Sequence, residues 1–202
     1  MALGNHELDW GEDVLKETLK LADFPVISCN TFYSDRISIP EWITPFTVVQ
    51  KQDITVGFAR YNMGSSVLAS VANQFYFPKA SEYIKKYSRE LRLSYNCDLV
   101  LGVGHDEGAN SSDYYLQDIE SVTYTDSTTG KPYVDGLMFA HDHATQSGRM
   151  NGVPYMEASC NGKKLGVLNY KLEYNGVLYE PKSNWVTILD AYNTCKVEDP
   201  AI

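Results

Sequence analysis

The histidines are the residues of this sequence whose type and placement point most directly to chemistry. Each follows a short apolar run, and the four are His6, His105, His141 and His143. Because loops that leave the carboxyl ends of strands in an open α/β sheet meet along one edge, we expect these loops to converge on a common rim. Neutral imidazoles are frequent ligands of divalent transition metals, and the amide oxygen of Asn5 adds a harder ligand beside them. The pattern predicts a metal site, whereas a single histidine on its own is more often a structural residue.

Two segments have the periodicity of helices that could hold these loops in place. Apolar side chains fall at helical spacing in residues 12–22, where Glu12 and Asp13 occupy the first turn and suit the helix dipole. Residues 79–95 repeat apolar positions at intervals of three and four, with charges between them. Both segments are predicted to be helices, and the second is the longer.

Strand-like runs lead into the histidine loops and continue along the rest of the chain. Residues 98–103 and 136–140 are almost wholly apolar, as expected of parallel strands that are covered on both faces. Other β-type runs cover residues 25–29, 46–50, 54–59, 154–158, 165–174 and 185–189. The polar turn 51–53 predicts a hairpin, and the three last runs look antiparallel. The sequence therefore predicts an α/β protein.

Composition excludes several classes of protein. The 202 residues include 17 Lys and Arg against 26 Asp and Glu, which gives a net charge of −9 and excludes a basic protein that coats nucleic acid. No apolar run approaches the ~18 residues that span a bilayer. We interpret the widely spaced cysteines as reduced thiols; they are Cys29, Cys97, Cys160 and Cys195. The length favours one domain over residues 1–202, with a loose tail over about 193–202.

Three of the loops carry motifs that resemble a known family. Gly4 to Gly11 reads GNHELDWG, Gly104 to Gly108 reads GHDEG, and Ala140 to His143 reads AHDH. In this order they resemble successive motifs of the calcineurin-like metallophosphoesterases. Residues 24–30, 55–58 and 152–166 resemble the bacterial branch of 5′-nucleotidases and 2′,3′-cyclic-nucleotide 2′-phosphodiesterases. The resemblance extends from residue 2 to about residue 174.

The resemblance implies a role for each candidate residue. Asn5, His105 and His141 would bind one divalent metal ion (Zn, Mn or Fe), and His143 would bind a second. His6 would face the phosphate as a hydrogen-bond donor or as the acid for the leaving oxygen. Asp9 would orient His6, because a carboxylate that accepts from one ring nitrogen fixes the tautomer of the other; the alternative for Asp9 is an ordinary acid near a helix start.

The resemblance further implies hydrolysis of nucleotide phosphate esters by a metal-activated water. In the family, a bridging Asp and an Asp-x-His motif precede the Gly-Asn-His motif, and only three residues precede Gly4 here. We therefore expect a fragment: a partial metallophosphoesterase-type sandwich of mixed β-sheets flanked by helices, with its first strands missing. Its metal site would be incomplete and the chain alone inactive. For the intact protein the resemblance suggests a small nucleotide substrate rather than a nucleic acid polymer, and a secreted, cell-wall or periplasmic location.

Two other interpretations remain open at this stage. One is a degenerate module that binds a metal or a phosphate without turnover. The other takes His141-x-His143 as the metal pair of a cupin-like barrel, although the helix predicted at residues 79–95 argues against an all-β protein.

Overall fold

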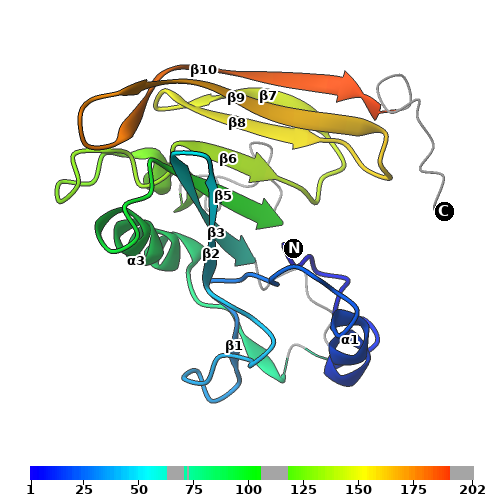
Figure 1. Cartoon of the computed structure of the whole chain (residues 1–202). Coiled ribbons are helices and arrows are strands. Elements are labelled where there is room, and N and C mark those ends of the chain that lie inside the picture. Colours follow the sequence, from blue (N-terminus) through cyan, green and yellow to red (C-terminus); the bar gives the residue numbers. More distant parts are fainter. Residues whose placement is uncertain (63–70, 72, 106–117, 192–202) are drawn as a thin grey trace.

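A computed structural model describes residues 1–62, 71, 73–105 and 118–191 of the chain (Figure 1). The helices are α1 (Glu12–Leu19), α3 (Ala80–Leu93) and the short 3-10 helix η3 (Ser121–Thr123). The strands are β1 (Phe32–Tyr33), β2 (Phe46–Lys51), β3 (Ile54–Asn62), β4 (Phe75–Tyr76), β5 (Leu99–His105), β6 (Gly136–Phe139), β7 (Thr145–Met150), β8 (Val153–Ala158), β9 (Lys164–Tyr174) and β10 (Tyr179–Asp190).

A six-stranded mixed sheet forms the centre of the molecule, with the strand order β2-β3-β5-β6-β8-β7. The four inner strands are parallel, whereas β2 and β7 pair antiparallel at the two edges. Asn62, the last residue of β3, lies opposite His105, the last residue of β5. The carboxyl ends of β3, β5 and β6 therefore meet along one edge of the sheet, which we call the rim (Figure 1). The predicted α/β class and the parallel pairing of the two apolar runs are confirmed.

Different elements cover the two faces of this sheet. Helix α3 packs on one face, where Ile84 and Leu91 join Val100 and Leu137 in a core from which solvent is excluded. The β9–β10 hairpin covers the other face (Figure 1), and the hydroxyl of Tyr170 donates to the carbonyl of Asp135 over 2.9 Å. Burial between these layers is the main source of stability.

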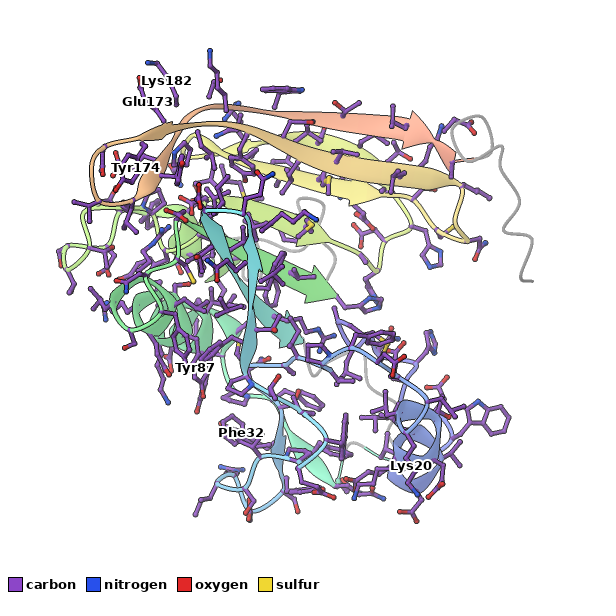
Figure 2. All side chains as sticks on the ribbon, in the orientation of Figure 1. Lys20, Phe32, Tyr87, Glu173, Tyr174 and Lys182 are labelled. Atoms are coloured by element: carbon purple, nitrogen blue, oxygen red, sulfur yellow. The ribbon has the colours of Figure 1, made fainter. Side chains whose placement is uncertain are left out.

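Labelled side chains show where the two covering layers lie (Figure 2). Lys182 of β10 donates to Glu173 of β9 over 2.6 Å at the exposed end of the hairpin. Tyr87 of α3 lies on the opposite side of the sheet, with its ring centroid 5.6 Å from that of Phe46. The hairpin and the helix thus enclose the sheet from opposite sides.

One buried carboxylate joins two hairpins at the edge of the sheet opposite the rim. Asp98, just before β5, is 3% exposed. Its Oδ2 accepts from the backbone N–H of Thr55 at 2.7 Å, and its Oδ1 accepts from that of Tyr179 at 2.6 Å. Asp98 therefore fixes the first residues of β3, β5 and β10 to one another.

A second apolar cluster lies under α1 and positions the N-terminal segment. Leu3, Leu8 and Leu15 pack there with Val26 and Phe75. Single parallel bridges connect Ala2 to Ile27 and Ile27 to Thr44. The predicted strand at 25–29 is thus reduced to one bridging residue, while the segment that enters the Gly4–Asn5 turn is held against it.

The structure confirms several of the other sequence predictions and corrects others. The helices at 12–22 and 79–95 are confirmed with earlier ends, and the hairpin about residues 51–53 is confirmed. Strand β7 was missed, because its sequence TQSGRM is polar and it lies on an edge with alternate residues exposed. Cys29, Cys97 and Cys160 are free thiols, as expected; Cys195 and the predicted tail lie outside the described residues. The parallel sheet and α3 contradict the cupin-like alternative.

Candidate functional site at the rim of the sheet

Three of the predicted metal ligands come into contact at the rim. His105 Nε2 lies 2.8 Å from Asn5 Oδ1 and 3.3 Å from His141 Nδ1. The rings of His105 and His141 meet edge to face, with centroids 5.2 Å apart. Asn5 is buried and the two histidines are partly buried. Side chains separated by 100 and 36 residues in sequence thus present oxygen and nitrogen atoms to one small volume.

A tight turn at residues 4–7 brings Asn5 to His105. The Gly4 N–H donates to the carboxylate of Glu7, which closes the turn. A Cβ on Gly4 would lie 2.8 Å from Glu7 Oε2 and 3.1 Å from His105 Nε2. A Cβ there would displace the Glu7 carboxylate and press on the His105 ring, so the absence of a side chain at Gly4 allows the close approach.

The loop after β6 carries backbone strain at two candidate ligands. His141 has φ 124° and His143 has φ 61°. Positive φ is disfavoured for residues with a Cβ, so the surrounding structure must hold these two residues in place. Backbone conformations of this kind cluster at functional sites. His143 itself is exposed, and it acts electrostatically on His105.

The environment keeps His105 neutral. Burial, together with the nearby charges of His141 and Arg60, lowers its pKa from the ordinary 6.5 to about 4. An Nε2–H tautomer of His105 can donate to Asn5 Oδ1, while the other tautomer leaves Nε2 as an electron-pair donor. A neutral imidazole is the form that binds metal ions.

The predicted pair of His6 and Asp9 is also formed. His6 Nδ1 lies 2.8 Å from Asp9 Oδ2, and the His6 side chain is 75% exposed. This contact fixes the orientation of the ring and leaves Nε2 directed away from the carboxylate. His6 can therefore offer a proton or a hydrogen bond to a group that approaches from solvent.

The donor set at the rim suits one divalent ion. Two ligand atoms of a single zinc ion are separated by about 3.0–3.4 Å, given bond lengths of about 2.1 Å, and the contacts of His105 are close to this range. Within the described residues, no group of three or more His, Cys, Asp or Glu side chains is placed to hold a metal ion. The rim cluster has two histidines and an amide, so it supplies donors without a carboxylate.

Two charged residues near the rim were missed by the sequence analysis. Glu7 lies within the recognised GNHE motif and received no role. Arg60 is fully buried in β3, and the expected strand stopped one residue before it. The sequence did contain a signal for Arg60, because it is a charged residue that directly follows an apolar strand leading to the rim.

Comparison with known proteins supplies the family context. No family model matches the sequence. The 2′,3′-cyclic-nucleotide 2′-phosphodiesterase/3′-nucleotidase of Salmonella typhimurium is 26% identical over 194 residues, which cover 84% of this chain and 29% of that protein. The snake venom 5′-nucleotidase of Naja atra is 26% identical over 216 residues, covering 100% of this chain and 39% of that protein. The chain thus spans less than half the length of these relatives.

Solved structures agree with the sequence relatives. The calcineurin-like phosphoesterase YfkN from Bacillus subtilis superposes with a TM-score of 0.75 at 21% identity, over 98% of this chain and 64% of that one. The chain has the calcineurin-like phosphoesterase fold. The 5′-nucleotidase precursor from Thermus thermophilus superposes with a TM-score of 0.71 at 21% identity, over 95% of this chain and 38% of that one. The resemblance seen in the motifs is confirmed by these relatives and by the shared fold.

Length and apolar character decide whether a helix of this chain could span a membrane. Within the described ranges, none is long and apolar enough to cross a bilayer.

Proposed function

We propose that this chain forms part of a metal-dependent phosphoesterase that hydrolyses nucleotide phosphate esters, of the 5′-nucleotidase or cyclic-nucleotide phosphodiesterase type. The observation that carries the proposal is the contact of Asn5, His105 and His141 at the rim, beside the His6–Asp9 pair. The names of the sequence relatives, all nucleotide phosphoesterases, support the substrate class.

In this proposal the residues divide into two groups with different tasks. Asn5, His105 and His141 would hold one divalent ion, and His143 would contribute to a second. A bound ion of this kind acidifies a water molecule, so that hydroxide is available near neutral pH. His6, oriented by Asp9, would stabilise charge on the phosphoryl group and hand a proton to the leaving oxygen.

The donor set also favours a second candidate function. Asn5 and the three histidines are all neutral as ligands, and two adjacent cations need an anionic bridge to offset their repulsion. The three donors in contact, Asn5, His105 and His141, include no such carboxylate. A module that binds one metal ion or a phosphate without turnover is therefore the alternative, and a dinuclear hydrolase requires an anionic ligand in addition to these donors.

An assay of hydrolysis separates the two functions. Adenosine monophosphates and 2′,3′-cyclic adenosine monophosphate should be tested with Mn²⁺ or Zn²⁺, using both the 202-residue chain and the longest polypeptide that its gene encodes. Metal-dependent turnover that His141→Ala abolishes supports the phosphoesterase. Metal or phosphate binding in both polypeptides without any turnover supports the binding module and refutes the enzyme.

Location is proposed from the relatives alone. They include snake venom 5′-nucleotidases and a structure described as a 5′-nucleotidase precursor. We propose action outside the cytoplasm, which fractionation of the source cells would test.

A further inference from the structure

Arg60 carries a buried guanidinium group for which the described structure provides no hydrogen-bond acceptor. The residue is 0% exposed. Within the described part of the chain, no group accepts a hydrogen bond from its Nε, Nη1 or Nη2. An uncompensated buried charge is costly, because solvation is lost without being replaced by hydrogen bonds.

The other buried arginine of the core has acceptors for its Nη2, although its Nε and Nη1 have none among the described residues. Arg92 donates to Asp135 over 2.8 Å and to the carbonyl of Pro132 over 3.0 Å. The partly exposed Arg89 binds Asp126 through both Nε and Nη2. The fold therefore supplies a hydrogen-bonded carboxylate to each of these arginines, whereas no described carboxylate accepts a hydrogen bond from Arg60.

The position of Arg60 connects it to the rim. It lies on β3 opposite Val103, two residues before the pair formed by Asn62 and His105. In parallel strands, residues at this spacing face the same side of the sheet. Glu7 and His105, which flank Gly4 at the rim, are both close enough to interact electrostatically with Arg60. Arg60 thus lies beneath the residues that form the candidate site.

We propose that Arg60 is the receptor for a phosphate-class oxyanion at the floor of the rim. A guanidinium group carries five N–H donors in a planar fork that matches two oxygens of such an anion. Here all three nitrogens are without an acceptor, so an anion with several oxygens satisfies them where a single carbonyl would not. Glu7 and His105, which interact electrostatically with Arg60, are partly exposed at the rim.

The anion could be free phosphate or the phosphoryl group of an ester. The shared chemistry, a tetrahedral oxyanion, follows from Arg60 itself, whereas its identification with a substrate phosphoryl group rests on the proposed function. Glu7 is the competing negative charge, since its attraction partly offsets the effect of burial on Arg60. Removing the charge of Glu7 should therefore strengthen binding of the anion.

Thermal unfolding of metal-free protein tests this inference. The chain, treated with a chelator and kept in a phosphate-free buffer, is titrated with inorganic phosphate against sodium chloride of equal ionic strength. Phosphate should raise the unfolding temperature in a saturable manner, because a ligand that binds only the folded state stabilises it. A second titration with adenosine 5′-monophosphate, compared with adenosine, shows whether an ester phosphoryl group also binds.

Variants assign the effect to Arg60. Arg60→Met should weaken phosphate binding about 10- to 100-fold, as expected for the loss of charged hydrogen bonds, and Arg60→Lys should weaken it less. Glu7→Gln, which can still accept from the Gly4 N–H, should bind phosphate more tightly than wild type. Arg149→Met is the matched control, since Arg149 is exposed and binds backbone carbonyls, and it should behave as wild type.

The results of the phosphate titration can be told apart from those of the hydrolysis assay that tests the proposed function. Phosphate binding that depends on Arg60 supports the inference whether or not any polypeptide hydrolyses nucleotides. The same stabilisation in wild type and in Arg60→Met, or no stabilisation beyond that of chloride, overturns it. If Arg60→Met does not fold, Arg60→Lys and Glu7→Gln still decide the question by their opposite effects on phosphate affinity.

Discussion

Acid should destabilise this protein through His105. Its pKa in the folded state is about 4, against 6.5 for the ordinary group, because burial disfavours the imidazolium ion. Between these two values the unfolded chain binds more protons than the folded one, so the free energy of unfolding falls as the pH is lowered through this window. The difference of 2.5 units corresponds to about 3 kcal/mol when the pH is below 4. From pH 7 to pH 5 the expected loss is about 2 kcal/mol.

Urea unfolding at pH 7, 6 and 5 measures this loss. The variant His105→Gln removes the titrating group while keeping a polar side chain, and its stability should change with pH by about 2 kcal/mol less than that of wild type. The readout is the pH dependence, so an overall loss of stability in the variant does not affect the conclusion.

Parallel pH profiles for wild type and His105→Gln would refute the reasoning. A pKa of His105 above 6, measured by nuclear magnetic resonance, would do the same. Either result would mean that water reaches the ring as freely as in the unfolded chain, and that the rim does not keep this imidazole neutral by burial.

Further predictions concern packing, ion pairing, metal content and catalysis. Gly104→Ala should cost about 1–3 kcal/mol of unfolding free energy in urea, because a Cβ there overlaps the buried ring of Tyr61; the same substitution should cost less when it is made in a Tyr61→Ala background. Arg92→Met should cost about 3–5 kcal/mol by leaving Asp135 buried without its cation, and a cost below 1 kcal/mol would contradict it. Metal analysis after dialysis should find at most one weakly held ion per chain; two tightly held ions would contradict the neutral donor set. In a polypeptide that shows turnover, His6→Ala should lower kcat by about 10²- to 10⁴-fold, whereas Asp13→Asn, at an exposed position of the first turn of α1, should not.

The sequence predicted most of the framework, because the elements that carry it have strong periodicity. The run at 98–103 is apolar on both faces, and it became β5 at the centre of the sheet. The helix at 79–95 presents one apolar face, and α3 buries Ile84 and Leu91 with that face. Strand β7 escaped prediction because an edge strand needs few apolar residues.

The site was predictable in its residues but not in its electrostatics. The motifs and the positions of the loops indicated Asn5, His105 and His141, which lie in contact. The burial of Arg60 depends on what the N-terminal segment and β5 place around it, and no local pattern encodes that environment. For the same reason the depressed pKa of His105 could not be predicted from its loop.

The hydrogen bonds of Asp98 determine which parts of this molecule tolerate mutation. They lock the starts of β3, β5 and β10 together at the end of the sheet away from the histidines. Length changes or exchanges of the loops at the rim therefore occur on strands whose register is already set from the other end. Mutational scanning should find two zones, one intolerant around Asp98 where even Asn is damaging, and one in the rim loops where new specificities can be selected without rebuilding the scaffold.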